Sequence, residues 1–100
     1  MNAPAYKDYV AEDARLVILR ELVAQANNTL NESLAQDVLE MWGHNKSREW
    51  VKTQIRKLDE LGAVRVTERD GFLICELTQA GMDHMLRRSV IEGVKRPTLR

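Results

Sequence analysis

The sequence predicts a single, mainly helical α+β domain in which three helices precede a β-hairpin and a fourth helix follows it. Before Gly62, three segments repeat apolar residues at the helical spacing of three and four. The pair Asp70-Gly71 then stands between two segments that alternate apolar and polar residues, which is the strongest short-range signal for a hairpin. With 100 residues, the chain has room for one hydrophobic core.

The first two helices are expected over residues 11–27 and 32–42. The pair Asn27-Asn28 interrupts the first apolar pattern, Asn31 is a good N-cap for the second helix, and Gly43 ends it. The residues expected to point inward are Leu16, Leu19, Leu22, Val23 and Ala26 from the first helix, and Leu34, Val38, Leu39 and Met41 or Trp42 from the second.

A third helix is expected over residues 48–61, with Ser47 as its N-cap and Gly62 after its end. At 100° per residue, its apolar positions fall on one side and most of its charged positions on the other. The inward residues are Val51, Ile55, Leu58 and Leu61, with Gln54 and Ser47 beside them.

The hairpin over residues 63–77 has a register that follows from its two-residue loop. With Asp70 and Gly71 in the loop, Arg69 faces Phe72 and Val66 faces Cys75. Alternation then separates the two faces of the hairpin. The core face is Val64, Val66, Leu73, Cys75 and Leu77; the other face is Arg65, Thr67, Arg69, Phe72, Ile74 and Glu76.

The fourth helix is expected over residues 79–91, capped by Thr78, with an apolar stripe of Met82, Met85, Leu86 and Val90. Gly93 ends the domain, which we place at residues 1–93. Residues 94–100 form a basic tail, in which Pro97 prevents the helix from continuing.

Composition narrows the class of protein. The chain is 44% apolar and 30% charged, and no apolar run approaches the roughly 18 residues of a membrane-spanning helix. The first residues lack the pattern of a signal peptide, so we expect a cytoplasmic protein. The single cysteine, Cys75, cannot form an intramolecular disulfide, and we interpret it as a buried hydrophobic residue.

The net charge of zero hides an uneven distribution. Residues 1–44 hold 3 basic and 7 acidic side chains, whereas residues 45–100 hold 12 basic and 8 acidic ones. A basic second half is a weak indication of an anionic partner, because the local field rather than the total charge steers an encounter.

The order of helix, helix, helix, hairpin and helix resembles a winged helix-turn-helix domain, in which the hairpin is the wing. Residues 45–81, with LDELGAVRV and LTQAG, are similar to the ArsR and MarR-like regulators. The whole chain resembles a family of small proteins from Mu-like phages and prophages, through EDARLVILREL, NESLAQDVLEMWGH, SREWVKTQIRKLDELG, LTQAG and GVKRP. The resemblance implies a winged-helix fold and a regulator-like role.

A winged helix would place its third helix in the major groove of double-stranded DNA and its wing beside a neighbouring groove. The residues expected to contact DNA are Lys46, Arg48, Glu49, Lys52, Thr53, Arg56 and Arg69. Lysine and arginine suit phosphates or guanine, Thr53 a thymine methyl group and Glu49 the cytosine amino group. In the tail, Lys95, Arg96 and Arg100 are a candidate basic arm, the alternative being a disordered end.

Because one neutral chain would bind DNA only modestly, we expect a homodimer that reads two half-sites. The candidate interface is the outer side of the first helix, with Val17 and Ile18, together with Met82, Met85 and Leu86 of the fourth. The alternative is that these side chains complete the core.

Two other interpretations of the charged helix remain open. Three of the eight charged residues from Lys46 to Glu60 are acidic, so this face could simply be solvated. A winged helix could also be a protein–protein adaptor in phage DNA packaging or head assembly. An adaptor would be insensitive to the loss of Lys52 or Arg56.

We expect no enzymatic activity, cofactor or metal site. His44 and His84 are far apart in the sequence and lack clustered ligands, and adjacent Asp83 and His84 point to different faces of a helix. Trp42 and Trp50 flank the turn between the second and third helices, where packing is the commoner role than base stacking.

Overall fold

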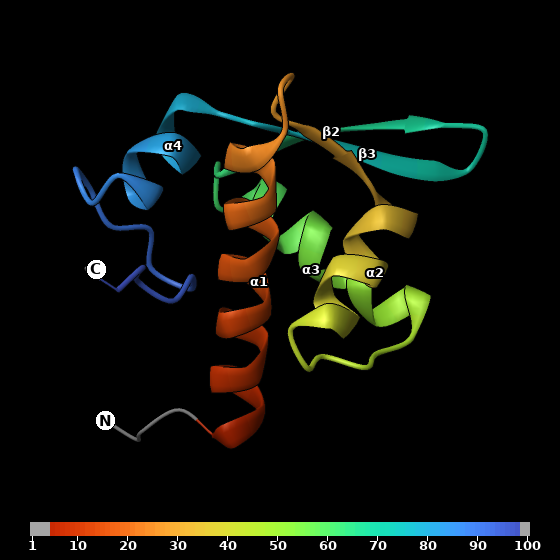
Figure 1. Cartoon of the computed structure of the whole chain (residues 1–100), viewed down its shortest axis with the longest axis horizontal. Helices are drawn as coiled ribbons and strands as arrows, with labels where there is room; N and C mark the ends of the chain where they lie inside the picture. Colours follow the sequence, from red (N-terminus) through yellow and green to blue (C-terminus); the bar gives the residue numbers. More distant parts are fainter. Residues whose placement is uncertain (1–4, 99–100) are drawn as a thin grey trace.

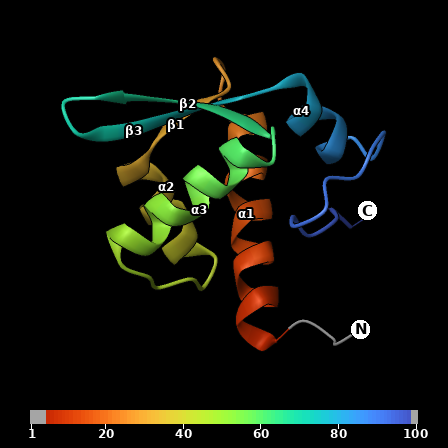
Figure 2. The ribbon, with the colours of Figure 1, turned by 180° about the vertical axis from the view of Figure 1, so that it is seen from behind.

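A central helix of 19 residues, α1 (Tyr6–Ala24), organises the structure, a computed structural model that describes residues 5–98. Helices α2 (Glu32–Met41) and α3 (Arg48–Glu60) pack on one side of α1, and α4 (Gln79–Met85) with the C-terminal segment packs on the other (Figure 1, Figure 2). The described residues therefore form an α+β fold that is mainly helical, as predicted.

The sheet has three antiparallel strands in the order β1-β3-β2. Strands β2 (Val64–Arg69) and β3 (Phe72–Leu77) form the hairpin, which projects beyond the helices (Figure 1). Its register is the predicted one, with Arg69 opposite Phe72 and Val66 opposite Cys75. Positive φ angles of 51° at Asp70 and 83° at Gly71 produce the tight turn that determines this pairing.

Strand β1 (Thr29–Asn31) is an element that the sequence analysis missed. It pairs antiparallel with β3 and places Leu30 opposite Cys75. Asn28, with a φ of 57°, turns the chain out of α1 and into this strand. The strand ends where Asn31 caps α2, its Oδ1 accepting the N–H of Leu34 at 2.8 Å.

The core lies between α1, α3 and the inner face of the hairpin. The predicted inward side of α3 is confirmed, because Val51, Ile55 and Leu58 are fully buried. On the hairpin, Val64, Leu73 and Cys75 are buried, and Val66 and Leu77 pack against the core from its margin, which confirms the predicted core face. Burial raises the pKa of the Cys75 thiol to about 12, so this cysteine is an inert core residue.

Helix α1 covers a different range from the predicted one. It begins at Tyr6 rather than residue 11, because the Asp8 carboxylate accepts the N–H of Ala5 at 3.1 Å and closes the first turn. It ends at Ala24 rather than residue 27, where Gln25 is extended. Val23, predicted to point inward, is 38% exposed at this end.

Helix α2 uses a different face from the predicted one. Its buried residues are Glu32, Ala35 and Leu39, whereas Leu34 is 50% exposed, Met41 82% and Trp42 55%. The prediction that Leu34 and either Met41 or Trp42 point inward is therefore wrong. The helix carries apolar residues on two sides, and the side with small Ala35 allows the closer approach to its neighbours.

Helix α4 is shorter than the predicted 79–91. It ends at Met85, because Arg87 adopts a left-handed conformation with a φ of 62° and reverses the chain. The buried His84 side chain holds the returning segment: its Nδ1 accepts the N–H of Ile91 at 3.0 Å, and its Nε2 donates to the carbonyl of Lys95 at 3.0 Å. Leu86 and Val90, predicted for the apolar stripe, are 50% and 48% exposed.

Gly81 is the tightest contact between α4 and the hairpin. A Cβ atom at this position would lie 2.3 Å from the carbonyl oxygen of Ala63 and 2.7 Å from Cδ1 of Leu77. We expect Gly81→Ala to lower the free energy of unfolding by about 1–3 kcal/mol, because a backbone oxygen must move. Urea denaturation beside Ala80→Ser, an exposed change expected to cost under about 0.5 kcal/mol, tests this. Equal stability of the two variants would show that α4 does not pack this closely against Ala63 and Leu77.

Candidate nucleic-acid interface

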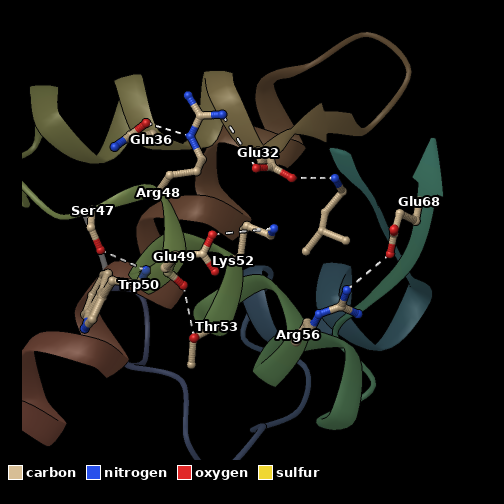
Figure 3. Close-up of polar contacts among 11 residues, drawn as sticks. Glu32, Gln36, Ser47, Arg48, Glu49, Trp50, Lys52, Thr53, Arg56 and Glu68 are labelled. Carbon is tan, nitrogen blue, oxygen red and sulfur yellow. Dashed lines mark hydrogen bonds and ion pairs between the residues drawn. The ribbon is translucent and has the colours of Figure 1, made fainter. Parts of the chain in front are cut away.

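The outward face of α3 is positioned by the helix cap and by the core. Ser47 caps the helix, its Oγ accepting the N–H of Trp50 at 3.1 Å, as predicted. Because Val51, Ile55 and Leu58 anchor one side, the opposite side faces solvent with Glu49, Thr53 and Arg56 exposed and Lys52 partly exposed. Four of the seven residues predicted to contact DNA thus share one helix face (Figure 3).

Arg48, which was predicted to contact DNA, binds side chains of α2 instead of extending into solvent. Its Nε donates to Oε1 of Gln36 at 2.7 Å, and its two terminal nitrogens lie 3.5 Å from Ser33 Oγ and Glu32 Oε2 (Figure 3). The guanidinium group connects α3 to α2 and remains 37% exposed. Arg48 therefore holds the two helices in a defined relation as its main role.

Glu32 is a buried carboxylate that the sequence analysis did not single out. Its side chain is 3% exposed, and Oε1 accepts the backbone N–H of Leu73 at 2.6 Å. In the antiparallel pairing of β1 with β3, Asn31 stands opposite Ile74, so the next position of the pairing would place Glu32 opposite Leu73. Since the chain turns into α2 at this point, the Glu32 carboxylate replaces the strand carbonyl that would otherwise accept this N–H.

The face of α3 continues onto the hairpin through Arg56. Its Nη2 lies 3.4 Å from Oε1 of Glu68 on β2, and both side chains are 57% exposed (Figure 3). Next to it, Lys52 Nζ lies 3.8 Å from Oε1 of Glu49. Exposed pairs of this kind contribute little to stability, so both cations remain available to a stronger anion.

Lys46 and Arg69 flank this surface rather than lie on it: Lys46 precedes α3, and Arg69 lies on the hairpin face opposite to that of Glu68, because side chains alternate along β2. The ammonium group of Lys46 stands over the Trp50 ring at 5.1 Å from its centroid. Arg69 is exposed near the hairpin turn, opposite Phe72, which is 52% exposed. A shallow groove of about 390 Å³ runs from this end of the hairpin to the start of α2; it is lined by Asn31, Ser33, Arg69, Asp70, Phe72 and Ile74. We refer to Lys52 and Arg56, beside Glu68 of the hairpin, as the basic face, and to Lys46 and Arg69 as its flanking cations.

The C-terminal segment is docked rather than extended as an arm. Arg15 donates to the carbonyl of Gly93 at 2.6 Å, Val94 is buried, and the N–H and Nζ of Lys95 bind Glu12 and Asp13 of α1. This segment lies across α1 from α3 (Figure 1, Figure 2). Lys95, predicted for a basic arm, is paired with Asp13 of α1 at 3.1 Å while its side chain stays 55% exposed. Arg96 is exposed on the same segment, and Arg100 lies outside the described residues.

Asp13 joins three parts of the chain, because Oδ2 accepts from His44 Nε2 at 2.7 Å and Oδ1 from Lys95 Nζ at 3.1 Å. Burial alone would raise the pKa of this carboxyl, but hydrogen bonds and charges of His44 and Lys95 outweigh it and lower the pKa below its ordinary value of 3.8.

We expect Asp13→Ala to cost about 1 kcal/mol at neutral pH. Because the pKa is lower in the folded chain, the contribution of Asp13 is present above pH 3.8 and is lost as pH falls through the folded value. Urea denaturation at pH 7 and at progressively lower pH should show the difference from the wild type shrinking. A difference that stays constant with pH would contradict the role of the charge, and Asp59→Ala, an exposed carboxylate, is the control.

The chain is 47% identical over 90 residues to "Uncharacterized protein gp26" of Escherichia phage Mu, which covers 90% of this chain and 93% of gp26. The chain belongs to the family of phage Mu gp26. An uncharacterized protein of Haemophilus influenzae is also similar, at 36% identity over 76 residues that cover 75% of this chain and 74% of the Haemophilus protein. No protein-family model matches the chain, and no solved structure matches it significantly. The predicted resemblance to Mu-like phage proteins is confirmed.

In this member of the gp26 family, the part of α1 with Val17 and Ile18 is not free to contact a second copy. The prediction that Val17 and Ile18 lie there is wrong, since they are 3% and 0% exposed. The reason is that α1 is covered by α2 and α3 on one side and by α4 on the other. Of the other predicted interface residues, Met82 and Met85 are partly buried and Leu86 is half exposed.

The two histidines of this gp26 relative both have structural partners: Asp13 for His44, and backbone groups of residues 91 and 95 for His84. Within residues 5–98, no group of three or more His, Cys, Asp or Glu side chains is placed to hold a metal ion. None of the described helices has the length and apolar character needed to span a membrane. The two tryptophans differ, because Trp50 packs against the core whereas Trp42 is exposed beside Arg20, 4.9 Å from its guanidinium carbon.

Proposed function

We propose that this member of the gp26 family is a winged-helix DNA-binding protein that acts as a phage or prophage transcriptional regulator. Support comes from the element order α1-β1-α2-α3-β2-β3-α4 and from the pairing of β1 with β3. In this assignment α2 and α3 are the helix-turn-helix and the β2–β3 hairpin is the wing.

The observation that carries the proposal is the continuity of the basic face from α3 to the hairpin. The ion pair between Arg56 and Glu68 shows that the outer side of α3 and the hairpin form one surface. Lys52 and Arg56 lie on its helix part, which suits a helix in the major groove (Figure 3). Arg69, exposed beside the hairpin turn on the opposite face from Glu68, is the residue that a wing would bring to the next groove.

The rigidity of this surface also fits recognition of a duplex. Arg48 connects α3 to α2 through a partly buried hydrogen bond, and Glu32 connects α2 to β3 through a buried one, so a movement of α3 against the hairpin would strain both contacts. A surface with a defined relation between helix and wing presents its cations at a constant spacing. That spacing is what the regular grooves of double-stranded DNA require.

A homodimer remains part of the proposal. The exposed apolar side chains of Leu86 and Val90, next to the partly buried Met82 and Met85, are the interface we propose for it. They lie on the opposite side of α1 from α3 (Figure 2), so dimerisation through them would leave both basic faces free. Two copies would double the phosphate contacts.

The test is fluorescence anisotropy of labelled duplex DNA from the phage genome at about 50 mM salt, where the phosphate term is strong. The proposal predicts saturable binding by the wild type and strongly weakened binding by the double variant Lys52→Ala, Arg56→Ala. Equal affinity of the wild type and the double variant for duplex DNA would show that Lys52 and Arg56 do not contact it.

A second function, that of a protein adaptor in DNA packaging or head assembly, is favoured by a different surface. Helix α2 exposes an apolar row in which Met41 is 82% and Leu34 50% accessible. Exposed apolar rows of this kind are more typical of protein contacts than of DNA contacts.

A further inference from the structure

Helix α2 has two apolar sides: the fold buries one, and of the other only Val38 packs against the core. The side with Glu32, Ala35 and Leu39 is buried. The other side carries Leu34, Val38 and Met41, which are spaced four and three residues apart and therefore form one row along the helix. We call Leu34, Val38, Met41 and the adjacent Trp42 the α2 stripe.

The α2 stripe is open to solvent along most of its length. Met41 is 82% exposed, Trp42 55% and Leu34 50%, and Val38 is partly buried at the centre. Single exposed apolar residues need no explanation, but a contiguous row on one helix indicates a contact surface. Within residues 5–98, Val38 packs against the core and Arg20 of α1 lies over Trp42, so Leu34 and Met41 are the openly exposed members of the stripe.

The two borders of the α2 stripe carry opposite charges. Asp37 and Glu40 are exposed on one border, and in the described part of the chain neither takes part in an ion pair or a side-chain hydrogen bond. On the other border, Arg20 of α1 lies over the Trp42 ring at 4.9 Å. A partner that fits must therefore bring basic groups to the side of Asp37 and Glu40.

We propose that the α2 stripe binds an amphipathic helix of a partner protein, with apolar side chains on Leu34, Val38 and Met41 and basic side chains facing Asp37 and Glu40. A helix suits this surface because its residues at i, i+3, i+4 and i+7 match a straight row of comparable length. Met41 is flexible and polarisable, so it can adapt to different apolar side chains. The charges at the two borders determine the direction in which the partner helix lies.

A second copy of this chain that pairs antiparallel fits the surface less well. In an antiparallel two-fold pairing through the α2 stripe, each border would face the same border of the other copy, so Asp37 and Glu40 would approach like charges. The site is separate from the basic face, and the inference does not depend on DNA binding. Loss of one activity can therefore be distinguished from loss of the other.

The test uses the full chain and a synthetic helical peptide of about 18 residues, long enough to form a helix, with leucine on one face and lysine beside it. Titration is followed by the fluorescence of Trp42 in a Trp50→Phe background. We expect a blue shift with saturation, weakened about tenfold or more by Met41→Asp, which changes an exposed residue. Asp37→Lys should weaken binding several-fold, whereas Asp59→Lys, the same charge change elsewhere, should not.

Three outcomes would overturn the inference: no fluorescence change with the peptide, equal affinity of the wild type and Met41→Asp, or binding of a glutamate-for-lysine peptide as tightly as the lysine peptide. Light scattering after size exclusion tests whether a second copy of the chain, rather than a partner protein, occupies the α2 stripe. A wild-type dimer that Met41→Asp converts into a monomer would assign the α2 stripe to a second copy instead. Met41→Asp is expected to leave affinity for DNA unchanged.

Discussion

Glu32→Ala is expected to lower the free energy of unfolding by about 3 kcal/mol, the largest effect of any polar substitution in this chain. The substitution removes the acceptor of the Leu73 N–H, which then has no partner in the protein, and takes away the carboxylate next to Arg48. Because the lost contacts connect α2 to β3 and α3, the hairpin and α3 should lose their fixed relation. Urea denaturation monitored by circular dichroism measures the change.

Glu32→Gln separates the two roles of this side chain. Glutamine keeps an oxygen for the Leu73 N–H but loses the charge beside Arg48, so we expect a loss of about half that of the alanine variant. If Glu32→Ala costs less than about 1 kcal/mol, the buried carboxylate does not hold the strands and helices together as described. Equal losses for both variants would mean that the charge rather than the N–H contact dominates.

Arg56→Ala is expected to weaken the proposed DNA binding by about tenfold or more, corresponding to about 1–3 kcal/mol for a base contact. Arg56 lies at the junction of α3 and the hairpin, where its present partner is Glu68. Glu68→Ala should have the opposite effect, a gain of a few-fold in affinity, because it frees Arg56 and removes a negative charge. Anisotropy titrations of the two variants at one salt concentration check both directions.

Arg88→Ala is the matched control for these titrations. Arg88 is 67% exposed and follows α4, which lies on the other side of α1 from α3 (Figure 1). Its replacement by alanine changes the net charge by the same amount as Arg56→Ala does. We expect little change in affinity. If Arg88→Ala weakens binding as much as Arg56→Ala, the protein responds to total charge and α3 has no special role.

The hairpin and α3 could be predicted in detail because local rules govern them. The Asp70-Gly71 turn determines the pairing of Val64 with Leu77 at the far end of the hairpin, without information from the rest of the chain. Likewise, α3 has a single apolar side, so its charged residues can only point outward. The positions of Lys52, Arg56 and Arg69 followed from these two elements.

The missed features depend on contacts between distant residues. Strand β1 has three residues, too few to show an alternating pattern, and exists because β3 offers a free edge. The end of α4 depends on His84 binding the backbone at residues 91 and 95. Burial of Glu32 depends on the N–H of Leu73, 41 positions away in the chain. Sequence periodicity carries no information about such partners.

Helix α2 shows a different limit of sequence reasoning. Because it has apolar residues on two sides, periodicity cannot tell which side faces the core, and the larger residues Leu34 and Met41 suggested the wrong one. The structure buries the side with Ala35, where the α1 and α3 helices can approach closely. The α2 stripe could therefore be recognised only once the core was known.

The most direct measurement of the central claim is the affinity for duplex DNA as a function of salt concentration. If Lys52 and Arg56 with the flanking Lys46 and Arg69 bind phosphates through about four cations per copy, the logarithm of the affinity should fall with the logarithm of salt concentration with a slope of about −3 to −4 for each bound copy, and about twice that for a dimer. Removing Lys52 should reduce the steepness by about one unit. No binding at about 50 mM salt, or a slope near zero, would contradict a DNA-binding role for α3 and the hairpin.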